Sequence, residues 1–85
     1  MKNQTILNAS LATDIANKDI VITPNKDTSY NVERMPTDGR RGPYLELAII
    51  VENEELATYI YYSKKDVAHD IKMLGKMFNT EFVEM

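Results

Sequence analysis

The stretch YLELAIIVENEELATYIYY (residues 44–62) carries the clearest secondary-structure pattern in the chain. Apolar side chains occupy every second position of its first half: Leu45, Leu47, Ile49 and Val51. Such alternation predicts a β-strand with one buried face. The polar segment NEE (residues 53–55) predicts a turn, and the apolar segment LATYIYY (residues 56–62) predicts a returning strand. We therefore expect the two strands to form an antiparallel hairpin.

The segment that follows, SKKDVAHDIKMLGKMF (residues 63–78), predicts a helix. Ser63 is a typical N-cap residue, and Asp66 follows three residues later in the manner of a capping box. Four apolar residues recur at intervals of four, three and four: Val67, Ile71, Leu74 and Phe78. They form one stripe, so we expect this helix to lie against the sheet.

Residues outside this region predict one more helix and three more strands. In TILNASLATDIANK (residues 5–18), apolar residues recur every fourth position, as on one face of a helix. Three short segments predict strands: DIVIT (residues 19–23), SYNVERM (residues 29–35) and TEFVEM (residues 80–85). The predicted order is α-β-β-β-β-α-β. This order favours an α+β fold, with two helices on one face of a small antiparallel sheet.

The length of 85 residues predicts one domain that spans residues 1–85. Hydrophobic residues make up 44% of the chain and charged residues 27%, which is typical of a globular protein. A domain this short buries a small core, and a shared interface would supplement it. We therefore expect a homodimer.

The chain contains no cysteine, which excludes disulfides and thiolate ligands to zinc. No apolar run has the length of a membrane span, and the first 19 residues lack the apolar region of a secretory signal. These features predict a cytoplasmic protein.

All three arginines lie close together in the sequence: Arg34, Arg40 and Arg41. The last two belong to the segment PTDGRRGP (residues 36–43), which predicts a hairpin loop with glycines on both sides of the arginine pair. Guanidinium groups bind phosphates and carboxylates with paired hydrogen bonds, so this loop is a candidate contact with a partner. The alternative is a solvated loop whose charge serves solubility.

Tyrosines form a second candidate surface. Tyr59 and Tyr61 share one face of their predicted strand, Tyr44 begins the partner strand, and Tyr62 points the other way. Aromatic rings on an open sheet face stack on bases or anchor a protein partner. The alternative is cross-strand packing within the domain.

The predicted helix at residues 63–78 also carries a basic stripe: Lys65, His69, Lys72 and Lys76. This secondary stripe is a candidate contact for nucleic acid. The alternative is the ordinary solvated face of an amphipathic helix, because Asp66 and Asp70 lie beside it and dilute its charge.

No residue pattern favours catalysis. The chain has one histidine, His69, and no motif supplies a nucleophile or acid to work with it. The acidic turn ENEE (residues 52–55) lacks the spacing of a calcium loop, and no phosphate-binding glycine loop is present. We expect neither enzymatic activity, nor a cofactor, nor a metal.

Two functions follow from these candidates. The first is a small inhibitor or regulatory factor that binds another protein through the arginine loop and the tyrosines. Small inhibitory proteins of phages and mobile elements have this general size and composition. The alternative is a single-stranded nucleic-acid-binding protein, with tyrosines stacking on bases and Arg34, Arg40 and Arg41 holding phosphates. The net charge of −3 and the pI near 5.0 favour the protein partner.

Overall fold

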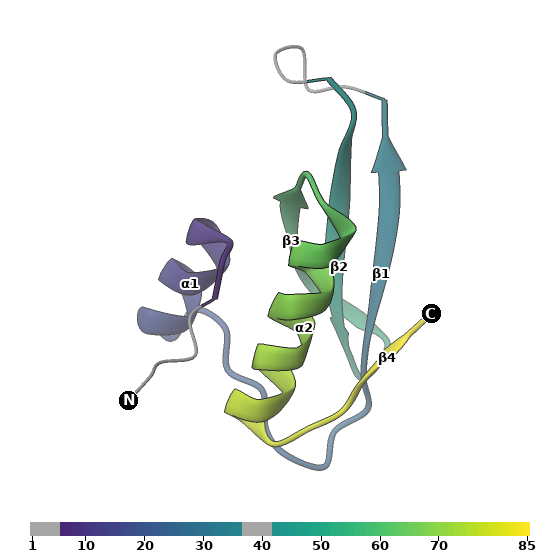
Figure 1. Cartoon of the computed structure of the whole chain (residues 1–85). Coiled ribbons are helices and arrows are strands. Elements are labelled where there is room, and N and C mark those ends of the chain that lie inside the picture. Colours follow the sequence, from purple (N-terminus) through teal and green to yellow (C-terminus); the bar gives the residue numbers. More distant parts are fainter. Residues whose placement is uncertain (1–5, 37–41) are drawn as a thin grey trace.

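The computed structural model describes residues 6–36 and 42–85, which form two helices and four strands (Figure 1). In chain order these are α1 (Ala9–Ala16), β1 (Thr28–Met35), β2 (Tyr44–Val51), β3 (Glu54–Tyr61), α2 (Lys64–Phe78) and β4 (Phe82–Glu84). The α+β fold predicted from the sequence is therefore confirmed, with one strand fewer than expected.

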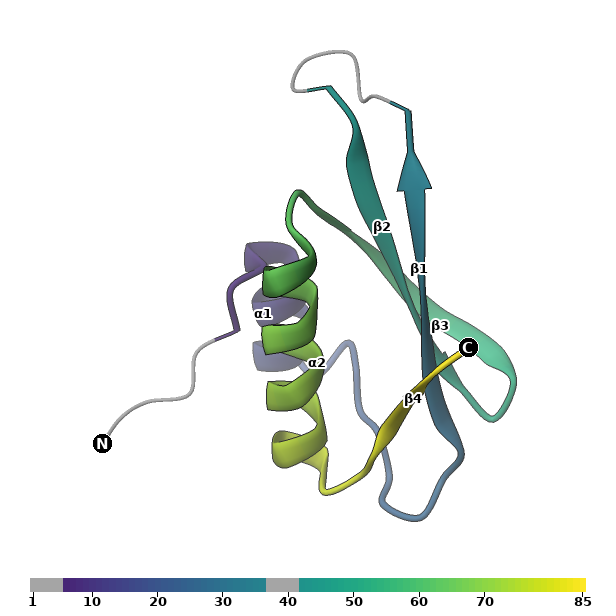
Figure 2. The same ribbon diagram turned by 45° about the vertical axis from the view of Figure 1, so that its right-hand side comes forward.

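The four strands form one sheet in the order β3-β2-β1-β4. β1 pairs antiparallel with β2, and β2 pairs antiparallel with β3. β4 pairs parallel with β1, because α2 carries the chain back across the sheet before β4 begins. The sheet is thus mostly antiparallel and not wholly so. Both helices lie on the same side of it (Figure 2).

The strand predicted at residues 19–23 is wrong. This segment has no assigned secondary structure, although its side chains alternate as they would in a strand. Ile20 and Ile22 are buried, while Val21 between them is 64% exposed. Residues 19–23 therefore form an extended connection that places every second side chain in the core. The connection has no partner strand among the described residues.

The β2–β3 hairpin contains two features that control which side chains face the helices. Its turn consists of Glu52 and Asn53, both with left-handed φ angles of 54° and 68°, as a tight two-residue turn requires. A β-bulge then follows, because Ile50 lies opposite Glu55 but Ile49 lies opposite Ala57. Leu56 is the extra residue, and it reverses the faces of all later residues of β3.

The core lies between the sheet and the two helices. Its most deeply buried apolar side chains come from three elements: Leu11, Leu47, Ile49 and Leu74. Ser63 caps α2 as expected, because its hydroxyl accepts a hydrogen bond from the N–H of Lys65. Within residues 6–36 and 42–85, no helix combines the length and apolar character needed to cross a membrane.

Candidate protein-interaction surface

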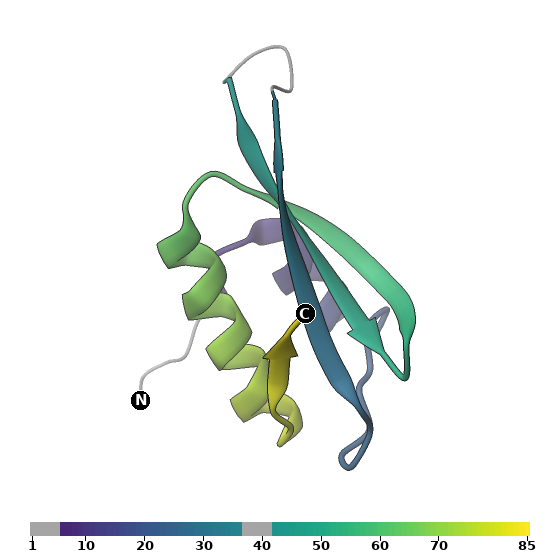
Figure 3. The ribbon, with the colours of Figure 1, turned by 90° about the vertical axis from the view of Figure 1, so that its right-hand side faces the viewer.

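The face of the sheet that points away from the helices is here called the open face (Figure 3). Strand register identifies its members. Leu45, Leu47 and Ile49 of β2 are buried against the helices, so the even-numbered residues of this strand point to the other face. Read across the strands, the open face consists of four rows of side chains.

The first row lies at the end of the sheet nearest the β1–β2 loop. Met35 of β1 lies opposite Tyr44 of β2, and Tyr62 follows β3 on the same face. Tyr62 is 45% exposed, whereas Met35 and Tyr44 are half-buried. This end of the open face is therefore apolar and aromatic.

The second row contains a pair of like charges. Glu33 of β1 lies directly opposite Glu46 of β2, and Ile60 of β3 lies opposite Glu46 on the other side. Opposed residues of antiparallel strands lie close together, so two carboxylates in this arrangement destabilise the free domain. Neither carboxylate forms an ion pair with any residue in the described part of the chain.

The remaining rows complete the open face. Asn31, Ala48 and Thr58 form a row of short side chains, in which Asn31 and Thr58 are polar and Ala48 is buried. The last row crosses all four strands as Val83, Ser29, Ile50 and Glu55, and the apolar bulge residue Leu56 follows Glu55. Val83 is 59% exposed and Leu56 is 43% exposed. Two apolar rows thus flank a central region that carries negative charge.

Tyr59 and Tyr61 do not lie on the open face. They are 5% and 4% exposed and pack in the core, so the expectation that they share an outward face with Tyr44 is wrong. The bulge is the physical reason. A regular hairpin with the same turn would have placed Leu56, Thr58 and Ile60 inward, and the extra residue places the two tyrosines there instead.

Both buried tyrosines donate hydrogen bonds to carboxylates from the helices. The hydroxyl of Tyr59 donates to Asp14 Oδ2 at 2.6 Å, and that of Tyr61 donates to Asp70 Oδ2 at 2.7 Å. Burial raises the pKa of both hydroxyls, and the bonds to Asp14 and Asp70 raise it further. These rings therefore stabilise the fold and are not available to a partner.

Asp70 is fully buried and holds three parts of the chain together. Besides the bond from Tyr61, its oxygens accept from the backbone N–H groups of Leu7 at 2.9 Å and Asn8 at 3.0 Å. Nδ1 of His69 lies 2.8 Å from Oδ1. Burial alone would raise the pKa of Asp70, but these four contacts outweigh burial and lower it. Sequence reasoning missed this role, although Asp70 lies on the same helical stripe as Val67 and Leu74.

The end of the sheet near the β1–β2 loop also forms a small cleft of about 150 Å³. Arg34, Tyr44, Tyr62 and Lys64 line it, together with Pro43 and Leu45. Arg34 is exposed because the β1–β2 hairpin extends beyond the helices (Figure 1). Two cations and two aromatic rings thus come together from β1, β2, the β3–α2 connection and α2. Arg40 and Arg41 lie outside the described residues.

The basic stripe predicted on α2 is present. Lys65, Lys72 and Lys76 are exposed, and the side chain of His69 is 39% exposed. The carboxylate of Asp70 is buried, and it opposes the charge of the stripe at His69, whose Nδ1 lies 2.8 Å from its Oδ1. Asp66 lies in the first turn, where it complements the helix dipole.

In the described parts of the chain, His, Asp and Glu side chains form no cluster of three or more that suits a metal ion. Comparison of the chain with protein-family models, with curated proteins and with solved structures finds no match.

Proposed function

We propose that the protein is a non-catalytic protein-binding module, a small inhibitor or regulatory factor that acts in the cytoplasm. Its binding surface is the open face together with the cleft at Arg34. The observation that carries this proposal is the exposure of four large apolar side chains on the open face, which no helix covers: Leu56, Ile60, Tyr62 and Val83. Exposed apolar side chains gathered on one face of a small domain are typical of interaction sites.

The order of the rows indicates what the partner presents. Apolar rows at both ends of the open face favour two apolar contacts. Glu33 and Glu46 between them favour a lysine or arginine of the partner, which would relieve the repulsion between the two carboxylates. Arg34 and Lys64 at the cleft favour an acidic group just beyond the first row.

The same surface argues against the alternative of a single-stranded nucleic acid. A phosphate backbone that crosses the open face would pass Glu33 and Glu46, which repel it. Two of the three tyrosines expected to stack on bases are in the core. What remains for that alternative is Tyr44 with Arg34, and the arginines of the loop, Arg40 and Arg41.

A different protein suits this surface better than a second copy of the chain. In a symmetric homodimer with its axis through the centre of the open face, Glu33 and Glu46 of one copy would approach the same residues of the other. Four carboxylates would then approach one another at the centre of the interface. We therefore favour a complex with a different protein over the expected homodimer.

Affinity capture with matched variants tests the proposal. Ile60→Asp puts a charge at the centre of the open face, and Val21→Asp puts the same charge on an exposed apolar residue of the α1–β1 connection. We expect quantitative mass spectrometry to show partners that bind the parent protein and Val21→Asp but not Ile60→Asp. The proposal is wrong if every captured protein is retained by both variants.

Two further measurements separate the alternatives. Random single-stranded DNA and RNA are titrated at low salt, and binding at micromolar concentration that Arg34→Ala weakens would favour the nucleic-acid function. Sedimentation analysis of the parent and of Ile60→Asp tests the homodimer. A dimer that Ile60→Asp dissociates would replace the heterologous partner with a second copy.

A further inference from the structure

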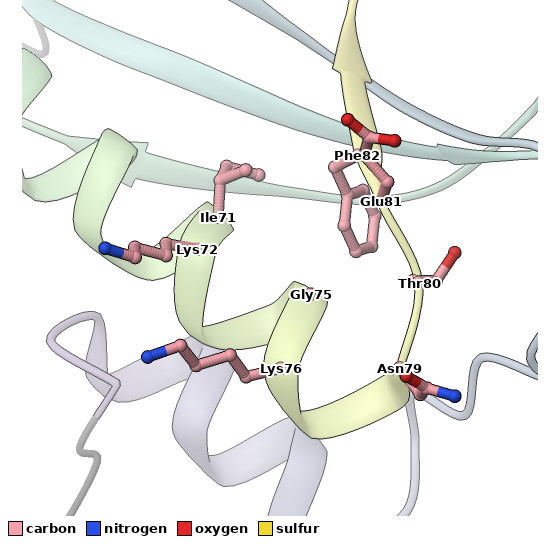
Figure 4. Close-up of a pocket in the computed structure, with 8 residues that line it drawn as sticks. All are labelled: Ile71, Lys72, Gly75, Lys76, Asn79, Thr80, Glu81 and Phe82. Carbon is pink, nitrogen blue, oxygen red and sulfur yellow. The ribbon is translucent and has the colours of Figure 1, made fainter.

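A groove separates α2 from the β1–β4 side of the sheet, away from the open face. Its wider part has a volume of about 610 Å³ and lies where α2 ends and the chain returns into β4 (Figure 4). A second part of about 250 Å³ lies near the start of α2, where the helix contributes Lys64, Val67 and Ala68 and the sheet contributes Tyr30, Val32 and Glu84. The helix residues that line both parts recur every three or four positions, so the groove follows one side of α2.

The floor of the wider part is apolar. Ile71 is 9% exposed, Phe82 is half-buried, and the ring of Phe82 points towards the helix at Gly75 (Figure 4). A Cβ atom at Gly75 would lie 2.9 Å from the carbonyl oxygen of Thr80. The close return of the chain therefore requires glycine at this position, and the missing side chain leaves the floor uncovered.

One wall of the groove is cationic. Lys72 and Lys76 are exposed, lie one helical turn apart and line this part of the groove, and their ammonium groups extend from α2 on the side away from Phe82 (Figure 4). Neither forms an ion pair with an acid in the described ranges. Glu81 lies on the opposite wall as the single carboxylate among the residues that line this part. The groove thus favours a ligand that combines an apolar group with more than one negative charge.

The other wall is the edge strand β4. The N–H of Met85 donates to the carbonyl oxygen of Tyr30 at 2.9 Å, so Met85 directs its backbone groups towards β1. Because these directions alternate along a strand, Phe82 and Glu84 direct theirs away from the sheet. At the opposite edge, the side chain of Asn8 donates to the carbonyl oxygen of Ile60 and so occupies one backbone acceptor of β3. β4 is therefore an edge strand whose outward backbone groups at Phe82 and Glu84 can pair with a further strand.

We propose that this groove binds an extended acidic segment of a partner protein, added as a strand to β4. Alternate side chains of such a segment face α2. An apolar one would contact Phe82 and Ile71 above Gly75, and acidic ones on either side of it would reach Lys72 and Lys76. This contact is separate from the open face and does not depend on its function.

An NMR titration of the full chain with a synthetic peptide tests the inference. The probe is Ser-Glu-Thr-Phe-Thr-Glu-Ser, in which the two acids and the aromatic ring fall on one side of an extended chain. We expect saturable shifts of the Phe82 and Glu84 amides and slower hydrogen exchange at both. Lys72→Glu combined with Lys76→Glu should weaken binding at least about tenfold, because it replaces attraction by repulsion.

Three controls make the result specific. Lys18→Glu with Lys26→Glu reverses two exposed lysines elsewhere and should leave the affinity unchanged. Ile60→Asp should also leave it unchanged, which separates this site from the open face. The peptide Ser-Lys-Thr-Phe-Thr-Lys-Ser should not bind.

Four outcomes would overturn the inference. They are equal binding of the lysine peptide, an affinity that survives the double reversal at Lys72 and Lys76, shifts confined to residues outside the groove, and tighter binding of a short single-stranded DNA at the same amides. The last outcome would assign the groove to nucleic acid.

Discussion

Tyr61 and Tyr62 are neighbours in the sequence but lie in opposite environments. Tyr61 is 4% exposed and donates a hydrogen bond to a buried carboxylate, whereas Tyr62 is 45% exposed on the open face. The same contrast separates Ile49, which is fully buried in β2, from Ile60, which is 48% exposed in β3. Side-chain type does not distinguish the two faces of this sheet. What distinguishes them is whether a helix supplies apolar cover and polar partners.

The largest expected difference between the two faces is in packing. Ile49→Ala should lower the free energy of unfolding by about 2–5 kcal/mol, because it removes a fully buried side chain and leaves a cavity. Ile60→Ala removes the same atoms from the open face and should cost less than about 1 kcal/mol. Urea denaturation monitored by circular dichroism measures both. Equal losses would show that the open face is covered in the free protein.

A smaller difference is expected for the tyrosine hydroxyls. Tyr61→Phe removes a hydrogen bond to a buried carboxylate and should cost about 1.5–3 kcal/mol. Tyr44→Phe removes a hydroxyl that has no hydrogen-bond partner among the described residues, and it should change stability by less than about 0.5 kcal/mol. Thermal unfolding of both variants beside the parent gives the comparison. A larger loss for Tyr44→Phe would contradict the assignment of the two faces.

The smallest expected effect is a pH dependence of the folding stability, which comes from Asp70 on the helix-covered side of the sheet. The pKa of Asp70 is lowered in the folded protein, so its ionised form stabilises the fold above the unfolded value of about 4. That contribution is lost as the pH falls through the lowered pKa. Denaturation midpoints measured from about pH 6 to pH 3 should therefore fall less steeply for Asp70→Asn than for the parent. The exposed variant Asp27→Asn should keep the steeper decline.

The fold class and most elements followed from the sequence because periodicity reports burial directly. The apolar stripe of α2 and the alternation in β2 each have one face that can only be buried. β3 is different, because large apolar or aromatic side chains lie on both of its faces. A bulge of one residue decides between them, and nothing in LATYIYY (residues 56–62) indicates where it falls.

The candidate surface was predicted only in part for the same reason. Tyr44 and Arg34 lie at the surface as expected, whereas Tyr59 and Tyr61 belong to the core. The repulsion between Glu33 and Glu46 depends on the register of two strands separated by a loop, which the sequence alone does not fix. The position of Asp70 on an apolar helical stripe does indicate its buried role, because a carboxylate there requires hydrogen-bond donors from elsewhere in the fold.

The four contacts at Asp70 also bear on the order in which the protein folds. The three strands β1, β2 and β3 form two successive hairpins, whose contacts are local in sequence and close quickly. The bonds from Leu7 and Asn8 span 63 and 62 residues, so they form only after α2 has docked on the sheet. We therefore expect the N-terminal segment to become fixed later in folding than the two hairpins, which hydrogen exchange at the amides of Leu7 and Asn8 would test. The carboxylate of Asp70 thus anchors the segment before α1, while the bond from Tyr59 to Asp14 and the buried Leu11 hold the helix itself.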